Sequence, residues 1–141
     1  MIRNAQITDA TGIQQLNKTA MGYDFPVAEA EKKLQSALAD PGQCVLVAVE
    51  NGQIVGYVHM EDYDTLYFPH MKNVLALAVE PGFRRREIAS QLLAAGETWA
   101  KETGAAGIRL VSGIQRVGAH VCYRRNGYQE LKLQKNFKKL F

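Results

Sequence analysis

The stretch that most constrains this chain is residues 75–93, which read LALAVEPGFRRREIASQLL. An apolar run predicts a buried strand, a Pro-Gly turn follows it, and three consecutive arginines lead into an amphipathic helix. The first amides of a helix have no intrahelical acceptor, and the positive end of the helix dipole lies there, so this position attracts anions. A strand, a basic turn and a helix in this order predict a site for the pyrophosphate of a nucleotide-like cofactor.

The composition favours one domain, which we expect to span residues 1–141. Hydrophobic residues make up 47% and charged residues 22%, as in ordinary globular proteins, and the net charge of +3 argues against nucleic acid as a partner. No stretch reaches the ~20 apolar residues of a membrane span and no signal peptide is visible, so we expect a cytoplasmic protein without a membrane partner. Cys44 and Cys122 lack metal-ligand spacing, which favours two reduced thiols and no metal.

Hydrophobic periodicity and turn residues predict alternating strands and helices on a mixed sheet with helices on both faces. The first half predicts a strand (2–7), two helices (about 8–20 and 27–38) and two strands (44–50 and 53–60) joined by the Asn51-Gly52 turn. A polar and aromatic connection (61–69) follows. The second half predicts a strand, a helix, a strand and a helix (71–79, 85–102, 108–112 and 117–125), then one or two closing strands (128–141). Lysines alternate with leucines in the last segment, which favours a strand with a solvated face over a nucleic-acid patch.

Two motifs within this order of elements resemble the GNAT superfamily of N-acetyltransferases, and the resemblance covers essentially the whole chain. The family fingerprint [Gln/Arg]-x-x-Gly-x-[Gly/Ala] falls on Arg84, Arg85, Arg86, Glu87, Ile88 and Ala89. The spacing Ala-x-x-x-Tyr-x-x-x-Gly-[Phe/Tyr] is matched by Ala119, Tyr123, Gly127 and Tyr128. The resemblance implies an α/β (α+β) fold with a mixed, mostly antiparallel central sheet of 6–7 strands flanked by about four helices.

The resemblance also implies acetyl-CoA as cofactor and a role for each matching position. In the family the loop amides of the first fingerprint hold the pyrophosphate, and the backbone of the preceding strand binds the pantetheine arm. That strand diverges from the next one and opens a slot for the thioester. Tyr123 would protonate the departing CoA thiolate, because a phenol can donate to a more basic sulfur anion. The implied cofactor-binding residues are Leu77, Ala78, Val79, Arg84, Arg85, Arg86, Glu87, Ile88, Ala89, Ser90 and Arg116.

Three positions depart from the family pattern. Glu87 replaces a glycine, and a carboxylate about 7 Å from a diphosphate costs on the order of 1–2 kcal/mol, unless the arginines offset it or the side chain turns outward. Asn73 stands where some members have a glutamate base and cannot act as one. Arg116 replaces a frequent asparagine and either contacts CoA or is solvated at a helix start. The nearest candidate bases are Glu61, Asp62, Asp64 and His70, with His59 read as structural.

Two aromatic and acidic segments, residues 22–26 and 61–70, border the acceptor pocket that the resemblance implies. Aromatic faces and carboxylates together favour a cationic ligand such as a primary amine. The alternative is that these side chains pack the loops or a dimer contact. The candidate acceptor-binding residues are Tyr23, Asp24, Phe25, Asp62, Asp64 and His70.

The sequence therefore predicts an enzyme that transfers an acetyl group from acetyl-CoA directly to a primary amine, in particular a small cationic amine. Two alternatives stay open. One is a protein or peptide N-acetyltransferase. The other is an acyl-CoA-binding module with little catalytic activity, which the departures at Glu87 and Asn73 motivate. Family members often form dimers, so a homodimer stays open as well.

Overall fold

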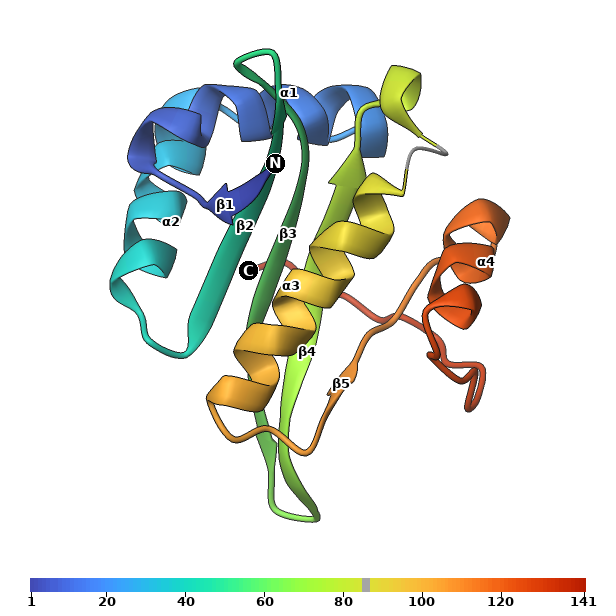
Figure 1. The fold of residues 1–141 in the computed structure, drawn as a ribbon. Coiled ribbons are helices and arrows are strands. Elements are labelled where there is room, and N and C mark those ends of the chain that lie inside the picture. The colour runs from blue at the N-terminus through green and yellow to red at the C-terminus, as the bar shows by residue number, and fades with distance from the viewer. Residues whose placement is uncertain (85–86) are drawn as a thin grey trace. The chain divides into compact units, whose positions relative to one another are not determined.

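The computed structural model describes residues 1–84 and 87–141, and its sheet lies within the first 111 residues (Figure 1). The described residues form five strands in the order β1-β2-β3-β4-β5. Strands β1 to β4 pair antiparallel, and β5 pairs parallel with β4. The strands are β1 (Ile2–Asn4), β2 (Gln43–Glu50), β3 (Gln53–Thr65), β4 (Phe68–Val79) and β5 (Gly107–Arg109).

Helices lie on both faces of this sheet, as predicted (Figure 1). Helices α1 (Ala10–Met21) and α2 (Val27–Ala39) pack on one face, where Leu16 and Leu34 meet Val47 and Tyr57 of the sheet. Helix α3 (Ile88–Glu102) covers the other face. Burial of apolar surface on both faces explains why β2 and the central part of β3 read as nearly continuous hydrophobic runs.

Helix α3 lies close to the sheet at Gly96. A Cβ atom at this position would lie 2.4 Å from the sulfur of Met60, a residue that is itself fully buried on β3. Only a hydrogen atom fits between the helix backbone and the Met60 side chain. The glycine therefore sets the depth at which α3 packs.

Residue contacts divide the chain into Met1–Val111 and Ser112–Phe141. The second unit contains helix α4 (Val117–Arg125), whose bounds agree with the prediction. The prediction of one or two closing strands at 128–141 is wrong, because the described residues there form no strand. Leu131 and Leu133 are 85% and 75% exposed, so the alternating pattern buries no face. A strand also needs a neighbour for its backbone hydrogen bonds, and the pairs that the structure describes include none with this segment.

The hairpin between β3 and β4 is longer than predicted. The sequence predicts a polar and aromatic connection at 61–69, but β3 continues to Thr65 and β4 begins at Phe68, with a turn at Leu66 and Tyr67. The hairpin end is largely exposed, so its sequence lacks the apolar alternation that marks a half-buried strand. Cross-strand pairing, including Asp62 opposite Lys72, extends the ladder instead. The predicted strand at 108–112 is correspondingly shorter, since β5 ends at Arg109.

An ion pair joins β1 to the start of the first helix. The Arg3 guanidinium donates to both carboxylate oxygens of Asp9, at 2.7 Å and 3.0 Å, and the Gln6 N–H donates to the same carboxylate at 2.7 Å. The Asp9 residue is only 6% exposed. The hydrogen bonds from Arg3 hold the pKa of Asp9 below its usual value.

The Asp9→Asn variant is expected to lose about 2 kcal/mol of unfolding free energy at pH 7, because it breaks a largely buried, charge-assisted pair. Since the pKa of Asp9 is lower in the folded state, the stabilisation is complete above the unfolded-state pKa of about 3.9 and is lost as the pH falls through the folded-state pKa. Urea denaturation at pH 7 and pH 3 should therefore show a smaller difference between the two proteins in acid. An equal difference at both pH values would contradict this assignment.

Candidate active site

The sheet opens between β4 and β5. The two strands pair only at Met71–Gly107, Lys72–Ile108 and Asn73–Arg109, and then diverge (Figure 1). Beyond Asn73, strand β4 continues for six residues to Val79. Its register against β3 shifts at Leu75, because Ala76 and Val74 oppose consecutive β3 residues, which marks a bulge.

The β4 edge beyond the bulge directs backbone groups into this opening. The Glu80 N–H donates to the Val55 carbonyl on β3 at 2.8 Å. Successive strand residues point their N–H groups to opposite sides, so those of Val79 and Leu77 face away from β3 and that of Ala78 faces it. The Arg84 side chain donates to the Val79 carbonyl at 3.4 Å from the side of the opening. The backbone N–H groups of Leu77 and Val79 at this edge are thus directed toward the space where an extended ligand could bind.

Helix α3 begins at Ile88, directly after Glu87. Glu87 has φ +63° and ψ +11°, the left-handed conformation in which glycine has no Cβ penalty. This gives a physical reason for the glycine that the fingerprint has at this position. The buried Ile88 anchors the first turn, and the amides of that turn have no intrahelical acceptor. The predicted roles of Arg85 and Arg86 lie outside the described residues.

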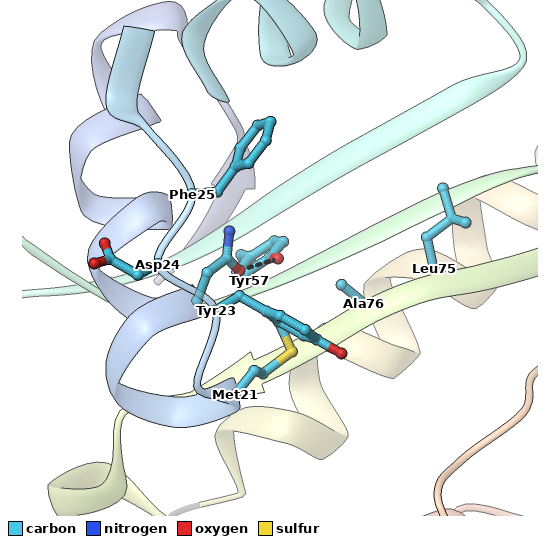
Figure 2. Close-up of a pocket in the computed structure, with 8 residues that line it drawn as sticks. Met21, Tyr23, Asp24, Phe25, Tyr57, Leu75 and Ala76 are labelled. Carbon is cyan, nitrogen blue, oxygen red and sulfur yellow. Dashed lines mark hydrogen bonds between the residues drawn. The ribbon is translucent and has the colours of Figure 1, made fainter. Parts of the chain in front are cut away.

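A pocket of about 450 Å³ lies where the loop between α1 and α2 faces β3 and β4 (Figure 2). The Tyr57 hydroxyl donates to Asn17 Oδ1, and burial raises the pKa of Tyr57 to about 12, so the phenol stays protonated at neutral pH. The Phe25 carbonyl accepts a hydrogen bond from Gln14 at 3.0 Å, which fixes the loop to α1. The pocket is lined by Asn17, Met21, Tyr23, Asp24, Phe25, Tyr57, Leu75 and Ala76.

The structure separates the predicted acceptor residues into two groups. Tyr23, Asp24 and Phe25 line the pocket. The other three, Asp62, Asp64 and His70, lie at the hairpin of β3 and β4. The pocket residue Ala76 lies six positions after His70 on β4, roughly 20 Å along an extended strand.

The hairpin group makes its own ion pairs. His70 Nδ1 lies 2.7 Å from Asp64 and its Nε2 lies 3.6 Å from Asp62. Asp62 also pairs with the ammonium of Lys72. These carboxylates are therefore engaged with Lys72 and His70 at the hairpin.

A polar network that sequence reasoning did not find lies between the two groups. Glu61, Asn73 and Arg109 come from three neighbouring strands and are joined by hydrogen bonds of 2.9 Å. Arg109 also lies over the Tyr63 ring, 4.5 Å from its centroid. Only the cross-strand register of the sheet brings these residues together, and local sequence carries no signal for it.

His59 Nε2 lies 2.8 Å from Gln43 Oε1. The Gln43 amide nitrogen donates to Asp40, so the oxygen faces the imidazole, and His59 Nε2 carries the hydrogen. Burial lowers the pKa of His59, partly opposed by the charge of Glu61. The ring is therefore neutral at pH 7, in a structural hydrogen bond of the kind predicted for it.

In the second unit, the residues of the second motif build a local structure around Tyr123. Gly127 has φ +89°, which turns the chain after α4 so that the Tyr128 N–H donates to the Tyr123 carbonyl at 3.0 Å. The two tyrosine rings pack edge to face, 6.1 Å apart. Burial raises the pKa of Tyr123, and the charge of Arg116, the exposed residue before α4, partly offsets this. The phenol is thus a proton donor at neutral pH.

Comparison with known proteins finds relatives that cover most of the chain. The model of the acetyltransferase (GNAT) family matches residues 10–128. An aminoalkylphosphonate N-acetyltransferase of Salmonella typhimurium is 34% identical over 92% of this chain and 84% of its own length. An uncharacterized N-acetyltransferase, YhfO of Bacillus subtilis, is 28% identical over 92% of this chain and 89% of its own. The aminoglycoside acetyltransferase AAC(6')-Iy, solved with a CoA bisubstrate analogue, has a TM-score of 0.88 and 18% identity over 100% of this chain and 98% of its own.

The chain therefore belongs to the GNAT family of acetyltransferases. It is an N-acetyltransferase that uses acetyl-CoA, and its mixed sheet with helices on both faces is the family fold, with five described strands rather than the expected 6–7. Among the helices that the structure describes, none has the length and apolar character needed to cross a membrane.

Proposed function

We propose that the chain transfers the acetyl group of acetyl-CoA directly to the primary amine of a small molecule bound in the pocket of Figure 2. The observation that carries this proposal is that Leu75 and Ala76 belong to both features. They line the pocket, and they lie on β4 beside the opening toward β5. A cofactor along the β4 edge and an amine in the pocket would meet at the bulge.

In this proposal each part of the cofactor meets a distinct group. The backbone of Leu77 and Val79 binds the pantetheine arm, and Ala78 supports the strand between them. The amides of Glu87 to Ser90 hold the pyrophosphate, with the charges of Arg84 to Arg86. Tyr123 donates a proton to the departing thiolate, and Arg116 contacts the coenzyme.

The acceptor that the pocket supports best is a small cationic amine. The volume of the pocket, about 450 Å³, is within the usual range for small-molecule sites. Aromatic faces from Tyr23, Phe25 and Tyr57 attract an ammonium group, and Asp24 adds a negative charge. The names of the relatives suggest two acceptor classes to compare, aminoalkylphosphonates and aminoglycosides.

The test is thiol release from acetyl-CoA with aminoalkylphosphonates, aminoglycosides, simple diamines and lysine peptides as acceptors. We expect turnover with at least one small amine, and a higher KM for that amine, but not for acetyl-CoA, in the Asp24→Asn variant. Turnover of peptides alone would establish the peptide acetyltransferase instead. Tight acetyl-CoA binding without thiol release from any acceptor would establish the binding module.

The Glu87→Gly variant is expected to bind acetyl-CoA about tenfold more tightly, because it removes a negative charge beside the pyrophosphate and releases a non-glycine residue from the left-handed conformation. Isothermal titration calorimetry measures this. Glu87→Gln separates the two causes, since it removes the charge and keeps the side chain. Unchanged or weaker binding by Glu87→Gly would refute the expectation.

A further inference from the structure

Three side chains from β3, β4 and β5 form a directed hydrogen-bond chain. Arg109 donates to Asn73 Oδ1, and Asn73 Nδ2 donates to Glu61 Oε2, both at 2.9 Å. A guanidinium has only donors, so it determines which end of the Asn73 amide faces it, and the NH2 group must face Glu61. Arg109 is itself held over the ring of Tyr63. The Glu61 carboxylate is therefore oriented from two neighbouring strands.

This hydrogen-bond chain lies at the closed end of the opening between β4 and β5, since Asn73–Arg109 is the last pair that these strands make. It also lies beside the pocket. Alternate residues of β3 share a face, so Glu61 lies on the same face as the pocket residue Tyr57. The pair Glu61–Asn73 follows the pair His59–Ala76 on this face, about 7 Å further along the strands, and Ala76 lines the pocket.

Acetyl transfer to an amine requires that the nitrogen first lose a proton, and a carboxylate can accept it. A primary alkylamine has a pKa of about 10 and reaches the enzyme as an ammonium ion without a lone pair. Asp62 pairs with Lys72 and Asp64 contacts His70 at the hairpin, whereas Glu61 accepts a hydrogen bond from a neutral amide. Asn73, on the adjacent strand β4, donates this bond and holds the Glu61 carboxylate in place.

We propose that Glu61 accepts the proton of the acceptor's ammonium group, and that Asn73 and Arg109 position its carboxylate. The proposal rests on the proposed function. The ammonium gives one proton to Glu61, directly or through a water molecule, and leaves a neutral amine. The amine lone pair forms the new C–N bond and the C–S bond breaks. As the amide forms, the nitrogen loses a second proton, which offsets the proton that the departing thiolate takes up. Glu61 returns its proton to solvent after the amide leaves.

The test compares Glu61→Gln with wild type and with Glu31→Gln, a matched change at an exposed position on α2. With an alkylamine at pH 7 we expect kcat of Glu61→Gln to fall about a hundredfold, with an unchanged KM for acetyl-CoA. The deficit should shrink as the pH rises toward the pKa of the ammonium. It should vanish for 2,2,2-trifluoroethylamine, which is already neutral at pH 7. Glu31→Gln should match wild type throughout.

The Asn73→Ala variant tests the positioning role. We expect a loss of about tenfold with the same dependence on pH and on the amine, and no further loss when it is combined with Glu61→Gln. Asn73→Ala keeps Glu61 and therefore also serves if Glu61→Gln does not fold. The ionisable or charged neighbours include His59 and Tyr63 on the same strand and Arg109 behind Asn73, while Gln43 opposite Glu61 on β2 is neutral. His59→Gln should leave the pH dependence of kcat unchanged.

Wild-type kcat in Glu61→Gln would overturn the proposal. An equal loss for both amines at every pH would also overturn it, since it would show a role in binding rather than in proton transfer. A pH dependence that moves with His59→Gln instead would assign the proton to the imidazole. If wild type binds acetyl-CoA but acetylates no amine, the proposed function itself fails, and this outcome is distinct because it appears before any substitution.

Discussion

The Tyr123→Phe variant is expected to lose about a hundredfold in kcat while its KM for acetyl-CoA stays near the wild-type value. General acid catalysis contributes about 10²–10⁴-fold, and a thiolate is a good leaving group, which places the expected loss at the lower end. The substitution removes one oxygen and keeps the buried ring. Because burial raises the pKa of Tyr123, ionisation of this phenol should not limit the wild-type rate below about pH 10.

Steady-state kinetics with saturating amine measure this effect. Tyr128→Phe is the matched control, since Tyr128 packs edge to face against Tyr123 and belongs to the same motif. We expect this control to retain most of the wild-type kcat. Equal kcat values for wild type and Tyr123→Phe would remove Tyr123 from the chemistry.

The Lys72→Ala variant is expected to lose about 3 kcal/mol of unfolding free energy. Lys72 is 1% exposed, its ammonium pairs with Asp62, and it lies 4.1 Å from the centroid of the Trp99 ring. Alanine leaves an unfilled space where the methylene chain packs and removes the cation from the aromatic face. The change corresponds to roughly a 150-fold shift in the folding equilibrium.

Lys72→Met separates packing from charge in this prediction. Methionine restores most of the volume, and Asp62 is 41% exposed, so water can solvate the unpaired carboxylate. We expect this variant to lose less than about 1 kcal/mol in urea denaturation. Equal losses for alanine and methionine would show that the ion pair, rather than packing, stabilises this part of the sheet.

The sequence predicts the elements that are marked by helical periodicity, turn residues or a continuous apolar run, and it misses those whose order comes from cross-strand pairing. Helices α1, α2 and α4 and strand β2 follow from periodicity and turn residues, within a few residues of the observed bounds. The end of the β3–β4 hairpin was missed because its residues are mostly exposed and its order comes from cross-strand pairs. The segment 128–141 has the alternation of a strand, but alternation alone supplies no partner strand.

Some features of the candidate site could likewise be predicted from the sequence, and others could not. The left-handed position of Glu87 could be predicted, because the fingerprint has glycine there. The pocket loop at Tyr23, Asp24 and Phe25 could also be predicted from its aromatic and acidic character. The hydrogen bond from Arg109 to Asn73 could not be predicted, since the two residues are 36 positions apart in the sequence and meet only through the parallel pairing of β4 and β5.

The tight contact between Gly96 and Met60 links the interior of the sheet to the coenzyme. We propose that the first turn of helix α3 holds the pyrophosphate, so the packing of the middle of this helix determines where those amides lie. A larger residue at Gly96 would have to displace the Met60 side chain or move the helix. In the proposed arrangement, mutations that never contact a phosphate therefore change the affinity for acetyl-CoA, and selection on this glycine would act through ligand binding as well as through stability.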